Sequence, residues 1–133
     1  MTETEKIVAK FVNGFGGQRY QAIFDILQAN NLRPLGKSNT ETLLFQFRGS
    51  DSMMHDIFAF RLGPPSVISF PKSYWLGRAT ELNEYLSNFS YSERPATTGP
   101  VSSSQNSAGQ VEITRSTHER IVEVCSCVCA SLQ

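Results

Sequence analysis

The chain has 133 residues, of which 40% are hydrophobic and 18% are charged, and its 12 basic residues balance 12 acidic ones. A chain of this length fits one domain that can bury a core without disulfides or metals. The balanced charge, without a run of like charges, excludes the basic footprint that nonspecific nucleic-acid binding requires. A charged fraction below the roughly 25% of an average protein leaves room for a buried interface.

The first 30 residues predict two helices. Thr2 and Glu5 have the spacing of a capping box, and apolar residues recur at helical intervals until the glycine-rich stretch "NGFGG". A second helix is predicted from about Gln18 to Asn30. Its apolar stripe consists of Tyr20, Ile23, Phe24 and Leu27.

After "RPLGKSN" the apolar period changes from 3.6 to 2, which predicts strands over 43–48, 55–62 and 66–70. The connections "GSDS" and "GPP" are short, and short turns imply an antiparallel meander. In the second strand, strict alternation places Asp56 on the same face as Phe58 and Phe60. Arg48 and Arg61 are expected on the faces opposite Phe47 and Phe60.

A helical period returns over 74–89, where Trp75, Leu82 and Leu86 share a face that should cover the sheet. Residues 91–110 are rich in serine, threonine, proline and glycine, which predicts a flexible linker or a long surface loop. Next come a short strand at "VEI" and a helix that a Ser116–Glu119 capping box would open. A strand remains the alternative over 121–130, because "VEVCSCVC" is rich in β-branched residues.

We therefore expect an α+β fold: two N-terminal helices, a three-stranded antiparallel meander, a covering helix, a flexible linker and a C-terminal helix. The domain organisation is a core over 1–90, the linker over 91–110, and a segment over 111–133 packed on the core or on a partner. The sequence shows no secretory signal, no membrane-length apolar stretch and no prenylation motif, since Ala130 stands fourth from the end. A cytoplasmic protein without membrane partners is the expectation.

No cofactor motif, metal-ligand set or catalytic constellation is recognisable, so we predict a protein that is not an enzyme. Cys125, Cys127 and Cys129 are the only cysteines, and a helix would set His118 about 10 Å from Cys125 along its axis. Buried reduced thiols are the simpler interpretation. No G-x-S-x-G elbow occurs, and His55 and Asp56, as neighbours in a strand, point to opposite faces.

The order helix, three antiparallel strands, helix, strand resembles the central order of restriction-endonuclease-like nucleases. Asp56 and Lys72 stand near the places of the acid and the lysine of that family, but Phe70 stands where the resemblance would require a second acid. The same order resembles the double-stranded RNA-binding domain. That family opens its last helix with clustered lysines, whereas "PKSYWLGR" offers one lysine and one arginine.

Our leading functional hypothesis is an interaction module that binds another protein or self-associates. Aromatic and arginine side chains are enriched at interface hot spots, and an apolar helix after a linker must bury its stripe. The candidate interface residues are Lys72, Tyr74, Arg78, Tyr85, Ile121, Val124 and Val128. The alternative is a nucleic-acid-binding or degenerate nuclease-like domain with a patch of Arg48, Arg61, Lys72 and Arg78.

Overall fold

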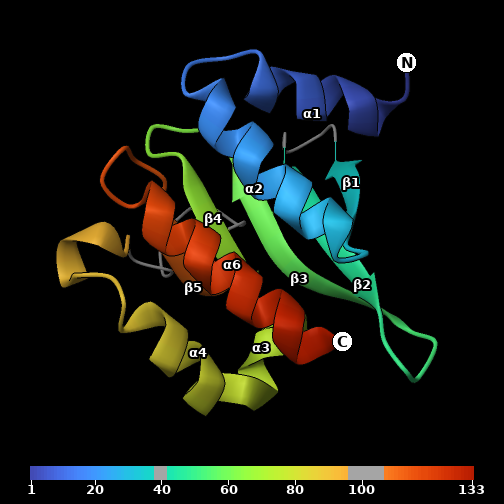
Figure 1. The fold of residues 1–133 in the computed structure, drawn as a ribbon, viewed down its shortest axis with the longest axis vertical. Coiled ribbons are helices and arrows are strands. Elements are labelled where there is room, and N and C mark those ends of the chain that lie inside the picture. The colour runs from blue at the N-terminus through green and yellow to red at the C-terminus, as the bar shows by residue number, and fades with distance from the viewer. Residues whose placement is uncertain (38–41, 96–106) are drawn as a thin grey trace.

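The computed structural model describes residues 1–37, 42–95 and 107–133 and shows helices layered on an antiparallel sheet (Figure 1). The helical elements are α1 (Glu3–Val12), α2 (Gly17–Ala29), α3 (Lys72–Trp75), the 3₁₀ turn η1 (Leu76–Arg78), α4 (Ala79–Leu86), the 3₁₀ turn η2 (Tyr91–Glu93) and α6 (His118–Leu132). The strands are β1 (Arg33–Lys37), β2 (Thr42–Arg48), β3 (Met54–Arg61), β4 (Val67–Pro71) and β5 (Ser107–Glu112). The predicted α+β class is thereby confirmed.

The sheet has five strands in the order β1-β2-β3-β4-β5, so the prediction of a three-stranded meander undercounts it. The missed strand β1 contains Pro34 and Gly36, which look like loop residues in the sequence. Proline is tolerated at a sheet edge, where its missing N–H is not needed. Gly36 donates its outward N–H to Thr4 Oγ1 at 3.0 Å, so α1 seals this edge.

The other outer strand, β5, begins at Ser107 inside the segment predicted to be a linker. Its residues pair with β4 from Val67–Glu112 to Pro71–Ser107. At the start of the same segment, Tyr91–Glu93 form η2 with a capping box between Ser90 and Glu93. The prediction of a flexible linker or long surface loop over 91–110 is therefore wrong for 107–110, which belong to β5, whereas 96–106 lie outside the described residues.

The core lies between the sheet and the layer of α1, α2 and α6 (Figure 1). Phe24 of α2 contacts the rings of Phe45 and Phe60 at centroid distances of 5.1 Å, so aromatic side chains join the helix to β2 and β3. From the C-terminal helix, Val128 and Cys129 are fully buried in the same core. Within 1–37, 42–95 and 107–133, the helices cover one face of the sheet, and we call the opposite face the helix-free face.

Strand β3 contains a bulge at Ile57. Phe45 pairs with Phe58, but the next residue of β2, Gln46, pairs with Asp56, so Ile57 is an extra residue without a cross-strand partner. Its carbonyl accepts a hydrogen bond of 2.8 Å from Trp75 Nε1. A bulge reverses the alternation of the side chains that precede it. Asp56 therefore lies on the helix-free face, and its predicted place beside Phe58 and Phe60 is wrong.

A second register shift occurs in β5. Phe70 pairs with Gly109 and Pro71 pairs with Ser107, which leaves Ala108 as the extra residue. The shift turns Ser107 to the helix-free face, on which Gln110 lies three residues further along the strand. Both bulges thus bring a polar side chain onto the face without helices.

The helices agree with the predictions in place but differ in detail. The Thr2–Glu5 capping box is confirmed. The predicted helix over 74–89 is broken by η1, which contains Gly77, a residue of low helix propensity. The segment 121–130 is helical, and the cap residue of α6 is Thr117, without the predicted Ser116 box. Within the described ranges, no helix has the length and apolar character needed to cross a bilayer.

Candidate functional site

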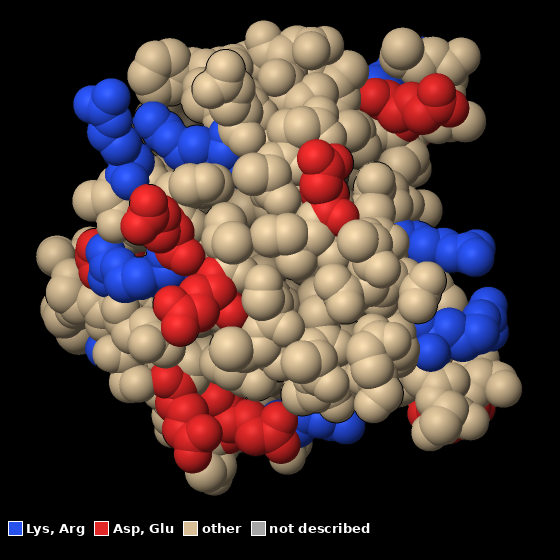
Figure 2. Space-filling model, in the orientation of Figure 1, with Lys and Arg blue, Asp and Glu red and all other residues tan. Residues whose placement is uncertain are grey.

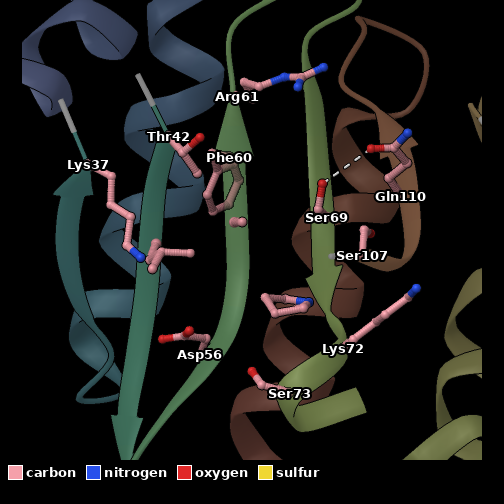
Figure 3. A pocket seen from close by; sticks show the side chains of 13 residues that line it. Lys37, Thr42, Asp56, Phe60, Arg61, Ser69, Lys72, Ser73, Ser107 and Gln110 are labelled. Carbon is pink, nitrogen blue, oxygen red and sulfur yellow. Dashed lines mark hydrogen bonds between the residues drawn. The ribbon is translucent and has the colours of Figure 1, made fainter. Parts of the chain in front are cut away.

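The helix-free face of the sheet is hollowed by a cavity of about 400 Å³, which we call the sheet pocket. All five strands and the start of α3 contribute to it. Its lining residues are Lys37, Thr42, Leu44, Asp56, Ala59, Phe60, Arg61, Ser69, Pro71, Lys72, Ser73, Ser107 and Gln110. Figure 3 shows the strands side by side with these side chains projecting from them.

Small side chains at the centre of the sheet explain the hollow. Ala59 of β3 pairs with Ser69 of β4, and on the other side Ala59 pairs with Leu44 of β2. Side chains of directly opposed residues lie on the same face of a sheet, about 5 Å apart. Because Ala59 and Ser69 are short while residues around them are long, the floor of the pocket lies below its rim.

The rim of the pocket carries three cationic side chains and one carboxylate. Lys37, Arg61 and Lys72 come from β1, β3 and α3 and lie on different sides of the pocket (Figure 3). Asp56 accepts a hydrogen bond of 2.8 Å from Gln46 Nε2 through Oδ1. Among the described residues, the lining thus combines three basic side chains with one acidic side chain, in a chain that is neutral as a whole.

Hydrogen-bonding groups lie between these charges. Ser69 Oγ donates to Gln110 Oε1 at 3.4 Å, a long bond that crosses from β4 to β5 (Figure 3). Thr42 and Ser73 add hydroxyl groups at two other places of the lining. The pocket thus offers both donors and acceptors to a polar ligand.

The structure brings together only part of the predicted nucleic-acid patch. Arg61 and Lys72 line the sheet pocket. Arg48 instead donates to the Ser52 carbonyl at 2.6 Å in the β2–β3 turn. Arg78 lies over the ring of Tyr74, with 3.9 Å between guanidinium carbon and ring centroid, and donates to the Tyr74 carbonyl at 2.9 Å.

Several residues of the sheet pocket were not predicted from the sequence, for identifiable reasons. Lys37 belongs to β1, whose proline and glycine are typical of a loop. Ser107 and Gln110 belong to β5, which begins inside the segment predicted to be a linker. Asp56 reaches the pocket through the Ile57 bulge. A bulge leaves no distinct mark on a strand of alternating residues, so no signal in the chain could have placed Asp56 there.

The predicted interface residues divide into two groups. Tyr74 and Tyr85 are half-buried and pack edge-on against Trp75, at 5.1 and 6.0 Å between ring centroids. The apolar residues of the C-terminal stripe are buried in this chain's own core. Ile121, Val124 and Val128 are 1%, 5% and 0% exposed. Because α2 and the sheet cover this stripe, it offers no surface to a partner here.

His55 has a carboxylate partner, but that partner is Asp51 and not the neighbouring Asp56. The His55 Nε2 atom lies 3.1 Å from Asp51 Oδ2, in the turn between β2 and β3. The Met53 N–H, donating at 2.9 Å, and the His55 ring hold the pKa of the Asp51 carboxyl below its usual value. The ring of His55 also contacts Tyr74 at 5.8 Å, which ties the turn to α3.

The cysteines do not form a metal site with one another. Cys125 and Cys129 are fully buried, and burial raises the pKa of both thiols, that of Cys129 to about 11. Cys127 is exposed on the opposite side of α6. Among the described residues, no group of three or more His, Cys, Asp or Glu side chains is arranged to hold a metal ion.

The nuclease-like resemblance finds limited support in the geometry. Asp56 and Lys72 both line the sheet pocket. Phe70, in the place of the second acid, instead faces the core, with its ring 5.6 Å from Phe58 and 5.3 Å from Trp75. Comparisons of the chain with protein-family models, with curated proteins and with solved structures found no match.

Proposed function

We propose that this chain is a non-enzymatic interaction module that binds another protein through the sheet pocket. The observation that supports the proposal is the helix-free sheet face itself, hollowed around Ala59 and Ser69 and bordered by charged side chains from separate strands. In the described part of the chain, the helices pack on one side of the sheet and the pocket opens on the other. The sequence analysis placed Ile121, Val124 and Val128 in the interface, but the structure buries these side chains in the core of the same chain.

The pocket is suited to a protein ligand for two reasons. Its volume of about 400 Å³ admits a few side chains but not a folded element. Its lining mixes apolar surface from Leu44 and Pro71 with hydroxyl and amide groups, the mixture found in protein interfaces. An extended segment of a partner can place side chains into the hollow between Ala59 and Ser69.

A photo-crosslinking amino acid introduced at Ser69 tests the proposal in the full chain. The control carries it at Lys6, an exposed residue of α1 in the helix layer. We expect one protein to be attached from position 69 and not from position 6, and the same protein, once identified and purified, to bind the unmodified chain in a titration. Adducts of the same identity from both positions would contradict a site on the sheet face.

The crosslinking experiment also distinguishes self-association from binding to a different protein. A product with twice the mass of the chain would indicate self-association, which light scattering of the untreated protein would check. A product with a different protein would indicate a heterologous partner. Absence of any specific adduct from Ser69 would overturn the proposed binding surface.

Nucleic acid is the second candidate ligand, because Arg61 and Lys72 of the predicted patch line the same pocket. Binding through phosphates releases counterions, so its affinity should fall steeply between about 50 mM and about 200 mM salt. Titration of oligothymidine and of a short RNA duplex at both salt concentrations tests this candidate. Affinity that is unmeasurable at low salt would exclude it.

A further inference from the structure

We infer that the sheet pocket selects an apolar side chain of its partner, of about the size of leucine, and not a charged group. This inference rests on the proposed function and adds the chemical class of the ligand. In the part of the chain that the structure describes, the polar groups of the lining either have partners already or lie in water at the rim. The surface that remains for a ligand to cover is the apolar floor of the pocket.

Several polar side chains of the lining form hydrogen bonds within the sheet. The Asp56 carboxylate accepts a hydrogen bond of 2.8 Å from an amide of β2, and Ser69 Oγ donates to Gln110 Oε1 at 3.4 Å. Ser107 Oγ donates to the Gly109 carbonyl at 2.6 Å and accepts the Gly109 N–H at 3.2 Å. A ligand that takes over one of these groups must break an existing bond, so the exchange yields little net free energy.

The other polar side chains of the lining are partnered or hydrated. Four of them have an interaction partner within the chain: Lys37, Thr42, Arg61 and Gln110. Lys72 and Ser73 open α3 at the rim of the pocket and are exposed to water. Because an ion pair with an exposed lysine adds little affinity, Lys72 alone does not favour an acidic ligand. A charged ligand therefore has little to gain from the described lining.

The floor of the pocket is suited to an apolar side chain. Leu44, Ala59 and Ser69 occupy directly opposed places on β2, β3 and β4, so their side chains lie on one face, about 5 Å apart. Ala59 contributes a methyl group, Leu44 borders it with an aliphatic side chain, and the ring of Pro71 also lines the pocket. Burial of apolar surface is favourable without a specific partner. An aliphatic side chain seated over Ala59 therefore gains free energy where a polar one does not.

The helix side of the molecule presents charge instead. Figure 2 shows acidic side chains gathered over α4 and α6. Exposed glutamates on these helices are Glu81, Glu84, Glu119 and Glu123. An apolar segment that covered these carboxylates would remove their hydration at a cost. This cost disfavours binding of an apolar ligand over α4 and α6 and so adds to the specificity of the sheet pocket.

Fluorescence anisotropy and backbone NMR of the full chain test the inference. The probes are three labelled peptides of equal length that alternate serine with leucine, with glutamine or with glutamate, so that side chains of one kind lie on one side of the extended peptide. We expect the leucine peptide to bind about tenfold to a hundredfold more tightly than the glutamine peptide. Its binding should shift the amide signals of Ala59 and Ser69, and its affinity should not fall as salt is added, because no charges are paired.

Two variants and a matched control locate the binding. Ala59→Leu fills the hollow with an apolar side chain and should remove binding of the leucine peptide. Ala22→Leu makes the same change at an exposed position of α2 and should leave the affinity unchanged. Ser69→Ala removes a hydroxyl group from the floor and should leave the affinity unchanged or raise it. Circular dichroism establishes that each variant is folded, and Ser69→Ala keeps the test decisive if Ala59→Leu does not fold.

The outcomes distinguish this inference from the function on which it rests. Preferential binding of the glutamate or glutamine peptide, or a loss of affinity in Ser69→Ala, would overturn the apolar ligand. A specific protein crosslinked from Ser69, together with a leucine peptide that binds no better than the glutamine peptide, would leave the proposed function standing and contradict the inference. If no peptide shifts signals from the sheet face and Ser69 yields no specific crosslink, both fail.

Discussion

Arg120 and Glu93 form a two-pronged ion pair, with Nη1 2.8 Å from Oε1 and Nη2 2.7 Å from Oε2. Arg120 also donates to the carbonyls of Asn88 and Ser116, each at 2.9 Å. The Arg120 side chain therefore links the turn after α4 with the turn before α6. The pair connects the segment before 96–106 to the C-terminal helix.

The ion pair predicts a loss of stability in acid. Arg120, and then the Ser90 N–H, lower the pKa of Glu93 from 4.5 to about 2. Because the folded state favours the ionised carboxylate, the pair stabilises the protein fully above pH 4.5 and loses its effect as the pH falls from 4.5 to about 2. Urea unfolding should show Glu93→Gln less stable than the parent chain at neutral pH.

The difference between Glu93→Gln and the parent should shrink as the pH falls below 4.5. Glu119→Gln is the control, since exposed Glu119 forms no ion pair in the described part of the chain. A constant difference across this pH range would show that Glu93 acts through packing or neutral hydrogen bonds.

The burial of two cysteines predicts three thiols with different reactivity. Thiolates are the reactive form, and burial raises the pKa of Cys125 and Cys129 while it also shields their sulfur atoms. We expect a disulfide reagent to modify Cys127 rapidly and the other two only as the protein opens. Cys127→Ser should remove the rapid phase. Rapid modification of a second thiol in that variant would contradict the burial of α6.

The close contact between α1 and β1 predicts a cost for any side chain at Gly36. A Cβ there would lie 2.9 Å from Ile7 Cδ1 and 3.0 Å from Thr4 Cα. Gly36→Ala should therefore lower the free energy of unfolding by about 1–3 kcal/mol, because helix and strand must separate. Gly77→Ala is the matched control, since a Cβ at Gly77 meets nothing within 4 Å. Equal stability of the two variants would contradict the packing of α1 on the sheet edge.

The bulge in β3 depends on Trp75, whose Nε1–H satisfies the Ile57 carbonyl at 2.8 Å. Trp75→Phe keeps an aromatic ring but leaves this buried carbonyl without its donor, at a cost of about 1–3 kcal/mol. Chemical denaturation measures the loss, and amide signals of Asp56 and Ile57 should report a change in the bulge. Tyr74→Phe, which retains its ring contacts, should have little effect. A fully stable Trp75→Phe variant would show that the bulge needs no support from α3.

Much of the architecture follows from local patterns in the chain. The apolar stripe of Tyr20, Ile23, Phe24 and Leu27 predicted α2, and the alternation around Phe45 and Phe58 predicted β2 and β3. These segments bury one face, so their periodicity is strong. The outer strands β1 and β5 could not be predicted in this way. Their proline, glycine and serine residues favour loops, and only pairing with a neighbouring strand makes them extended.

The sequence by itself determined the α+β class, the two N-terminal helices, the central strands and the helical face of Trp75, because each depends on contacts between near neighbours. Only the tertiary structure decided which side chains lie on the helix-free face. The Ile57 and Ala108 bulges turn Asp56 and Ser107 to that face, and β1 brings Lys37 beside β2. Strand order and register are set by long-range pairing and by the packing of Trp75 on the bulge. Such contacts join residues far apart in the chain, so no local pattern encodes them.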